Sequence, residues 1–273
     1  MTRYAECKQG TAGHGGQSPA RPFCLRRLYM LVKVGESRVD VRVEAVMSVP
    51  RLGFMDNFFT WAQALMPLGI RPTKVTGAFW GQCLQRVLEQ FADDCEYILT
   101  IDYDTFFCQA DVEHLLALAM TFQCDAITGL QTKREDGRPM LTMLDTLDNR
   151  PEDDKVSVPR EWFSAPVRQV DTAHFGCTFI STAALRRMPK PWFQGVPNDN
   201  GEWGDGRIDD DIFFWRQFKK AGNRLYVSPR VILGHGEYMV TWPGEMLAKP
   251  VHQHATDFCV NMKPPEGVWR VDQ

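Results

Sequence analysis

The sequence predicts an α/β fold built on a Rossmann-like, mainly parallel sheet flanked by helices, and three observations lead to this prediction. Short apolar or alternating segments take turns with amphipathic helical segments of about 10–14 residues, a spacing that favours parallel strands joined by right-handed crossovers. The 273 residues, 44% hydrophobic and 24% charged, are typical of a globular chain with one large domain. No apolar run approaches the roughly 20 residues that span a bilayer, so we expect no membrane partner.

The first half of the chain carries the regular alternation. Residues 41–49 alternate with period two and then become apolar before Pro50, which predicts a strand. Residues 82–91 repeat apolar side chains at i, i+3, i+4 and i+7, which predicts a helix. The same reasoning predicts strands over 74–78, 97–101 and 125–130, and helices over 56–66 and from Asp111, which we expect to cap its helix.

The second half is less regular. Residues 132–168 are charged and contain prolines, so we expect loops there. One strand is predicted over 170–181, followed by helices over 182–188 and 209–222. The aromatic runs at 58–61 and 213–215 fall on predicted helices, and we interpret both as core.

The composition divides the chain into three parts. Residues 1–35 carry a local charge of +5, which leaves −8 on the remainder, and they form either a flexible solvated leader or a basic arm for a polyanion. Residues 36–238 are expected to form a single domain, and residues 239–273 a tail that packs on it. Eight scattered cysteines without a C-x-x-C pair favour reduced thiols in the cytoplasm. We expect no obligate protein partner.

A pair of carboxylates follows the apolar strand at 97–101. Asp102 and Asp104 are separated by one residue, and ligands of open α/β sheets collect beyond the carboxyl ends of strands. Two desolvated carboxylates need a cation, and a hard divalent ion that also holds a diphosphate is the natural partner. The alternative is an acidic turn that faces water.

Two further motifs carry candidate chemistry. Asp209, Asp210 and Asp211 open a predicted helix, where capping explains one or two carboxylates but three like charges repel each other. One of them can act as a general base on a hydroxyl group. His235 follows an apolar run and lies between two glycines, and with Asp104 it offers an oxygen and nitrogen pair suited to Mn²⁺ or Mg²⁺. The alternative is a structural histidine.

In this order, these motifs resemble the metal-dependent GT-A glycosyltransferases, and within them the small family-2-like enzymes of bacteria and bacteriophages. The likeness covers about residues 41–238 and rests on an ordered set of segments: Ser48–Pro50, Ile101–Asp104, Gly176–Ser181, Pro189–Phe193, Asp210–Phe214, Ala221–Leu225 and Gly234–His235. It implies the GT-A fold of nucleotide-diphospho-sugar transferases, with a nucleotide-sugar half at 36–131 and an acceptor half at 132–238.

The resemblance also implies roles for individual residues. Asp104 and His235, with Asp102 nearby, would bind Mn²⁺ or Mg²⁺ against the diphosphate of a donor, most simply a UDP-sugar. Asp211 would be the catalytic base, with Asp210 beside it. Donor contacts would come from Val49, Pro50, Trp80, Gln82, Asp102, Tyr103 and Gly176, and acceptor contacts from Trp192, Phe193, Trp203, Asp209 and His174.

The sequence departs from the family pattern at two places. Gly81 and Gln82 stand where many relatives have an Arg-Asn pair, which puts the contacts to the donor base in doubt. An Asp-Asp pair at 210–211 replaces the usual Glu-Asp. His174 is an additional polar group within reach of the donor sugar.

The acceptor stays open between a glycan hydroxyl and a hydroxymethylated base in phage DNA, which would be flipped out of the duplex and stacked on a tryptophan. The net charge of −3 does not indicate nucleic acid, although a local basic patch suffices to bind it. Two other functions remain open: a sugar-nucleotide pyrophosphorylase, which should show a glycine-rich phosphate loop after the first strand, and a non-catalytic nucleotide-sugar-binding module, which would not need Asp210 or Asp211.

Overall fold

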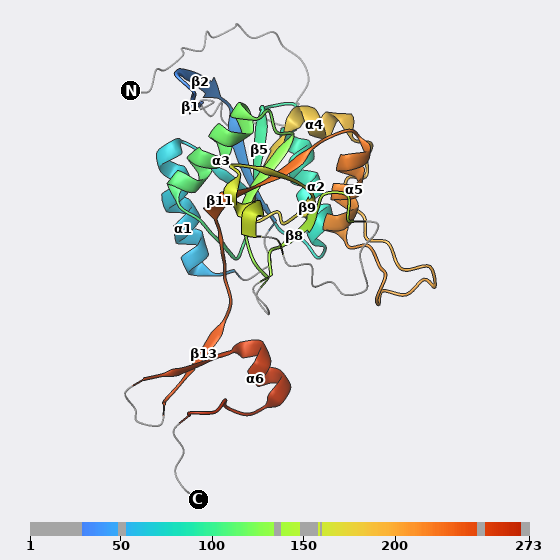
Figure 1. Cartoon of the computed structure of the whole chain (residues 1–273). Coiled ribbons are helices and arrows are strands. Elements are labelled where there is room, and N and C mark those ends of the chain that lie inside the picture. Colours follow the sequence, from blue (N-terminus) through green and yellow to red (C-terminus); the bar gives the residue numbers. More distant parts are fainter. Residues whose placement is uncertain are drawn as a thin grey trace, which may run out of the picture.

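The computed structural model describes residues 29–48, 53–133, 138–147, 158, 160–244 and 249–268. Its centre is an eight-stranded sheet with the strand order β4-β3-β5-β10-β7-β11-β9-β8 (Figure 1). The strands are β3 (Val43–Ser48), β4 (Pro72–Val75), β5 (Tyr97–Asp102), β7 (Ala126–Leu130), β8 (Leu141–Met143), β9 (Arg168–Ala173), β10 (Cys177–Ser181) and β11 (Leu225–Ile232). All of these strands except β9 and β10 run in one direction, so the predicted mixed, mainly parallel sheet is confirmed.

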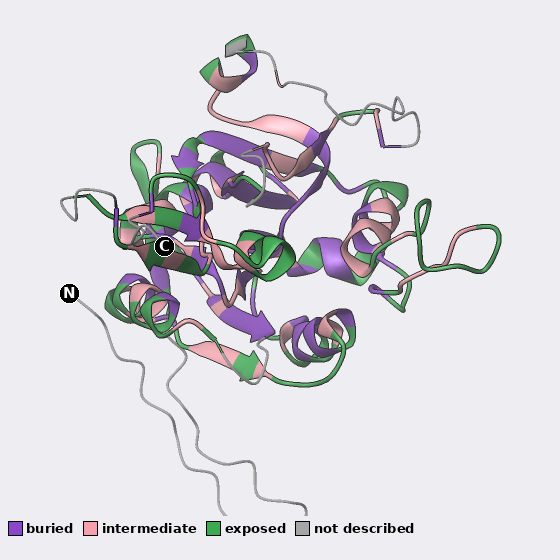
Figure 2. Cartoon of the chain, turned by 90° about the horizontal axis from the view of Figure 1, so that it is seen from below, coloured by how far each residue is buried: buried purple, intermediate pink, exposed green. Residues whose placement is uncertain are grey.

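Helices cover both faces of the sheet (Figure 1). One face packs on α1 (Met55–Leu65) and α3 (Gln109–Thr121), and the other on α2 (Trp80–Phe91), α4 (Thr182–Arg187) and α5 (Asp210–Lys220). Strand β5 is buried on both faces of the sheet. Leu99 and Ile101 lie in the core on the side of α1 and α3, and Ile98 lies in the core on the side of α2, α4 and α5. A strand buried on both faces has a continuous apolar sequence, and Figure 2 shows this central sheet as buried.

Three expectations about elements are wrong. Residues 170–181 form two strands, because the chain leaves β9 after Ala173 and returns at Cys177 to lie between β5 and β7. Helix α3 begins after Cys108, and Asp111 lies in its first turn, where its carboxylate accepts a hydrogen bond from the Cys108 amide at 2.8 Å. Phe58 and Phe59 are 46% and 56% exposed, so the first aromatic run is largely outside the core.

The two ends of the described chain also differ from expectation. Strand β1 (Met30–Val34) pairs with β2 (Ser37–Val41), and Met30 and Val32 are buried in the core beside α3, so ordered structure starts before residue 36. The C-terminal segment forms a hairpin of β13 (Met239–Trp242) and β14 (Val251–His254) followed by α6 (Ala255–Asn261). This unit projects from the body instead of packing on it (Figure 1).

The hairpin and α6 are held by their own contacts, with the rings of Trp242 and Phe258 centred 5.3 Å apart. Two further short 3-10 helices are η1 (Met66–Leu68) and η2 (Arg160–Ser164). Within the residues that the structure describes, none of the helices combines the length and the apolar character needed to cross a membrane.

Candidate functional site

Asp104 and His235, 131 positions apart in the sequence, meet at one point of the molecule. After β5 the chain turns into the two-residue strand β6 (Thr105–Phe106), which pairs with β12 (Gly234–His235) and places His235 opposite Thr105. The Asp104 Oδ2 atom lies 3.6 Å from the His235 Nε2 atom. The buried carboxylate and the imidazole therefore form a pair of metal-binding groups beyond the end of β5.

The orientation of the His235 ring suits a metal ligand. Its Nδ1 atom is 2.9 Å from the carbonyl oxygen of Thr132, and because a carbonyl only accepts, Nδ1 carries the proton of the neutral ring. The lone pair of Nε2 then points to the side of Asp104. Histidines that bind metals are held in this way by a hydrogen bond from their other nitrogen.

Asp102 lies in the same site with an altered acidity. Burial, with a further contribution from the charge of Asp104 and a smaller one from that of Asp211, raises its pKa to about 7, although a hydrogen bond from the Trp80 side chain and the proximity of His235 oppose the shift. The charges of Asp104 and Asp211 both act on Asp102, so the two acidic segments are electrostatically coupled through this buried carboxylate. A cation bound there would favour the ionised form of Asp102.

The donor set fits a metal ion that arrives together with a diphosphate. Across the described parts of the chain, no three His, Cys, Asp or Glu side chains lie close enough to enclose an ion alone. Asp104 and His235 supply two ligands, and Mg²⁺ in nucleotide enzymes is commonly held by one or two carboxylates with substrate phosphates and water. Mn²⁺ suits the imidazole better than Mg²⁺ does.

The three aspartates that open α5 have three different surroundings. Asp209 pairs with Arg207, whose Nε lies 2.7 Å from its Oδ1. The Asp210 carboxylate lies against the first turn of α2, where a Cβ on Gly81 would overlap it, and a Cβ on Gly195 would lie only 3.0 Å from its Oδ1. Asp210 therefore joins the beginnings of α5 and α2, and helix beginnings favour negative charge.

Asp211, together with Asp209, lines a cavity. Burial raises its pKa, the amide of Ile212 opposes the shift by donating a hydrogen bond at 2.8 Å, and the charges of Asp209 and Asp210 raise it further. The cavity has a volume of about 550 Å³. Asp209 and Asp211 contribute carboxylates to its lining, and Lys133 and Arg138 contribute positive charge.

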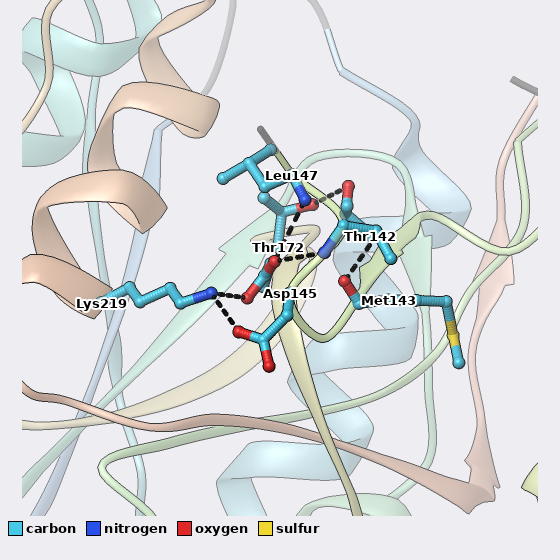
Figure 3. Close-up of polar contacts among 8 residues, drawn as sticks. Thr142, Met143, Asp145, Leu147, Thr172 and Lys219 are labelled. Carbon is cyan, nitrogen blue, oxygen red and sulfur yellow. Dashed lines mark hydrogen bonds and ion pairs between the residues drawn. The ribbon is translucent and has the colours of Figure 1, made fainter. Parts of the chain in front are cut away.

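The wall of this cavity formed by β8 is fastened to α5 by an ion-pair network (Figure 3). The buried Asp171 carboxylate of β9 accepts hydrogen bonds from the amides of Thr146 and Leu147, at 3.1 and 3.2 Å. It also binds Lys219 of α5 at 2.6 Å, and Lys219 reaches Asp145 at 2.9 Å. The loop after β8 is thereby held in a fixed relation to the helix that carries Asp211.

The aromatic residues expected around the acceptor do not form one wall. Trp192 and Phe193 are buried in the core between α2 and α5, so neither presents a free ring. Trp203 is 63% exposed, and its ring lies beside Gly195 close to the Asp210 carboxylate. Of the three, Trp203 alone has a ring that an acceptor can reach.

His174 and Gly176 lie between the two acidic segments. The Gly176 amide donates to His174 Nδ1 at 3.0 Å, and His174 Nε2 lies 3.1 Å from the carbonyl oxygen of Gly129. Burial lowers the pKa of His174 to about 4, so the ring is neutral and its nitrogens are both used within the protein. A Cβ on Gly176 would overlap Thr105, which means that internal packing requires this glycine. We interpret both residues as supports of the site.

The remaining expected donor contacts are spread along the rim. Trp80 packs its ring edge-on against Phe175 and Phe193, and Gln82 is exposed in the first turn of α2. Tyr103 stacks on Phe54, with ring centres 6.1 Å apart. Val49 and Pro50 lie outside the described residues.

Two buried amides of the site were missed by the sequence analysis. Gln131 follows β7, and Asn57 lies in the first turns of α1 and donates a hydrogen bond to the Thr105 carbonyl oxygen. Gln131 has the same signal as Asp102, a polar side chain directly after an apolar strand, and that signal could have identified it. Asn57 carries no comparable signal, because its role depends on a contact with a distant turn.

No family model matches this sequence, and no curated protein is significantly similar to it. Among solved structures, A197 from STIV is similar with a TM-score of 0.45 and 14% identity, over 73% of this chain and 96% of that one. GalNAc-T7, solved with UDP, GalNAc and Mn²⁺, is similar with a TM-score of 0.46 and 11% identity, over 71% of this chain and 44% of that one.

TarS 1–349 of S. aureus, solved with UDP-GlcNAc, is similar with a TM-score of 0.43 and 12% identity, over 72% of this chain and 58% of that one. The chain thus spans about half of the length of the two proteins that hold UDP or a UDP-sugar. Likenesses this distant do not assign an activity, which has to be argued from the residues of the site.

Proposed function

We propose that this chain is a GT-A-type glycosyltransferase that moves a sugar from a nucleotide-diphosphate sugar to an acceptor hydroxyl group. One observation supports the proposal: Asp104 and His235 lie 3.6 Å apart, and the charges of this pair and of Asp211, from distant parts of the sequence, all act on the buried Asp102. A metal-binding pair on one side and a buried carboxylate on the other are the two parts that this transfer needs.

Each side chain has a defined task in this reaction. Asp104 and His235 would hold Mn²⁺ or Mg²⁺, and the ion would supply Lewis-acid stabilisation of the departing nucleotide diphosphate. Asp211 accepts the proton of the acceptor hydroxyl as its oxygen bonds to the anomeric carbon and the bond from that carbon to the phosphate oxygen breaks. Because burial raises the pKa of Asp211, it is a stronger base than an exposed carboxylate. Asp210 positions the start of α5 against α2.

The cavity beside Asp211 is the proposed acceptor site. The Asp209 and Asp211 carboxylates in its lining suit the hydroxyl groups of a sugar, and Lys133 and Arg138 add the positive charge that a nucleic-acid backbone requires. A glycan and a hydroxymethylated base in DNA are therefore the two acceptors to test. We propose a UDP-sugar as the first donor to test.

The test is a panel of UDP-, GDP- and CMP-linked sugars incubated with Mn²⁺ and either hydroxymethylated DNA or a glycan pool, with products identified by mass spectrometry. The proposal predicts a sugar-sized mass increase on one acceptor and release of the nucleotide diphosphate. Asp211→Asn should slow this transfer by about 10²- to 10⁴-fold while calorimetry shows unchanged affinity for the donor.

The other functions predict different results. A pyrophosphorylase would convert pyrophosphate and a nucleotide sugar into a nucleoside triphosphate and a sugar 1-phosphate, without modifying any acceptor. A binding module would bind the nucleotide sugar, and Asp211→Asn would change nothing. Failure of the wild-type protein to release nucleotide from any donor in the panel would contradict the transferase proposal.

A further inference from the structure

The two segments that carry Asp104 and His235 are joined by the side chain of one buried residue, Gln131. Its amide nitrogen lies 3.2 Å from the Thr105 hydroxyl oxygen and 3.0 Å from the carbonyl oxygen of Gly234. Thr105 directly follows Asp104, and Gly234 directly precedes His235. A single carboxamide thus donates one hydrogen bond to each of the two segments.

The surroundings of Gln131 leave it little freedom. The residue is 3% exposed, and its Oε1 atom would lie 3.2 Å from a Cβ on Gly176, so the side chain is packed against that glycine. The next residue, Thr132, provides the carbonyl oxygen that fixes the His235 ring. Residues 131 and 132 therefore position both the backbone and the ring of His235.

The segments that Gln131 joins have little support of their own. Strands β6 and β12 pair over only two residues each, and a two-stranded ladder of this length is not stable in isolation. Asn57 adds a hydrogen bond to the Thr105 carbonyl oxygen on the β6 side. On the β12 side, the Gly236 amide donates to the Asp104 carbonyl oxygen at 2.6 Å.

We propose that Gln131 is a positioning residue that sets the separation of Asp104 and His235 and thereby the affinity of the pair for a divalent ion. The inference rests on the proposed metal-dependent function. Gln131 does not bind the metal ion itself. It acts through Thr105 and Gly234, and without its two hydrogen bonds only the short β6–β12 pairing and the hydrogen bond from Gly236 to Asp104 hold the two ligands at their separation.

The test is Gln131→Met, which keeps the approximate volume of the side chain and removes both hydrogen bonds. Mn²⁺ binding is measured without donor by electron paramagnetic resonance of the free ion, alongside thermal unfolding. Loss of a group that hydrogen-bonds a metal ligand directly weakens metal binding by about 10- to 100-fold, and because Gln131 bonds the neighbours of the two ligands, we expect a decrease near the lower end of this range. In the transfer reaction, the Mn²⁺ concentration for half-maximal rate should rise while the rate at saturating Mn²⁺ is largely retained.

Gln85→Met is the matched control. Gln85 is a half-buried glutamine of α2 whose side-chain oxygen accepts hydrogen bonds from the backbone amides of Trp192 and Phe193. Its loss should lower the unfolding temperature and leave Mn²⁺ affinity unchanged. An equal decrease of Mn²⁺ affinity in both variants, or no decrease in Gln131→Met, would overturn the inference.

A second variant tests the same hydrogen bonds if Gln131→Met does not fold. Thr105→Val preserves the shape of the side chain and removes one acceptor of the Gln131 amide, so it should weaken Mn²⁺ binding by a smaller factor than Gln131→Met. Unchanged Mn²⁺ affinity in Thr105→Val would count against the inference.

Asp104→Asn tests the metal site itself. If it leaves Mn²⁺ binding intact, the proposed function fails. If it abolishes binding and Gln131→Met does not weaken it, only the role of Gln131 fails.

Discussion

The carboxylates that follow β5 and those that open α5 place similar groups in different surroundings. Asp104 faces an imidazole that comes from β12, whereas Asp210 faces the first turn of α2 through the space left by Gly81. In each cluster a second carboxylate, Asp102 or Asp211, is shifted by burial to a raised pKa. The comparison teaches that the groups around each aspartate, and not the spacing of the aspartates in the sequence, decide its role. Asp104 and Asp210 are fixed by a neighbouring segment, whereas Asp102 and Asp211 have a raised pKa that favours proton exchange.

The largest expected effect separates Asp210 from Asp211. General-base catalysis contributes about 10²- to 10⁴-fold, so Asp211→Asn should reduce turnover by that range. Asp210→Asn keeps the shape that fills the space beside Gly81 and should reduce turnover by less than about tenfold, because it loses only a helix-end charge effect. Steady-state rates at saturating donor measure both. Equal losses would show that the two carboxylates are not divided in this way.

The second prediction concerns His174, which lies between the clusters. An unfolded histidine has a pKa near 6.5, and in the folded protein burial lowers it to about 4. At this site the unfolded state therefore binds more protons than the folded state between these values. The contribution of His174 to the free energy of unfolding is complete above pH 6.5 and is lost as the pH decreases to 4. The shift corresponds to about 3 kcal/mol of the free energy of unfolding.

Urea unfolding at pH 7 and pH 4.5 measures this effect. His174→Gln cannot titrate, so the difference in the free energy of unfolding between pH 7 and pH 4.5 should shift by the contribution of His174 relative to wild type, while the opposite contribution of Asp102 is common to both proteins; His114→Gln, on the exposed side of α3, should match wild type. The same pH dependence in wild type and His174→Gln would contradict the assignment of a buried neutral ring.

The smallest expected effect concerns the wall of the acceptor cavity. Lys219→Met removes the ion pair with the buried Asp171, but the lysine is 46% exposed, so the free energy of unfolding should fall by only about 1 kcal/mol. Hydrogen bonds to Asp171 and Asp145 raise the pKa of Lys219 in the folded protein. The ion pair therefore contributes fully to the free energy of unfolding at pH values below the pKa of an unfolded lysine. This contribution is lost as the pH rises past the pKa of Lys219 in the folded protein.

Chemical unfolding of Lys219→Met beside the exposed neighbour Lys220→Met measures this difference. Acceptor KM should rise modestly in Lys219→Met only, because the loop after β8 loses its link to α5. A loss of stability shared by both variants would assign the effect to helix charge and not to the Asp171 network.

The elements with strong periodicity could be predicted from the sequence. Helix α2 repeats apolar residues that are buried in the structure, and β5 is an apolar run because it is covered on both faces. Helix α1 shows the limit of this reasoning. Its apolar side chains suggest a core face at Phe58 and Phe59, yet the structure buries Asn57 and Leu65, because the turn at Thr105 needs the amide of Asn57.

The candidate site could be predicted in part. The proximity of Asp104 and His235 could be predicted because each follows an apolar run that forms a strand. Strand ends of an open α/β sheet meet at the same edge, which brings the two residues together. The burial of Trp192 and Phe193 could not be read from sequence, since it depends on Gln85 of a distant helix binding their backbone. The two hydrogen bonds of Gln131 could not be predicted either, because one acceptor is the backbone carbonyl of Gly234, and every residue has such a carbonyl whatever its side chain.

The central claim is that Asp104 and His235 bind one divalent ion that holds a nucleotide diphosphate. Crystals grown with MnCl₂ and UDP, with diffraction data collected at the manganese absorption edge, test it most directly. The account predicts an anomalous peak within bonding distance of an Asp104 carboxylate oxygen, His235 Nε2 and the phosphates of UDP. A manganese peak away from both side chains, or UDP bound with no ion between it and Asp104, would contradict the account.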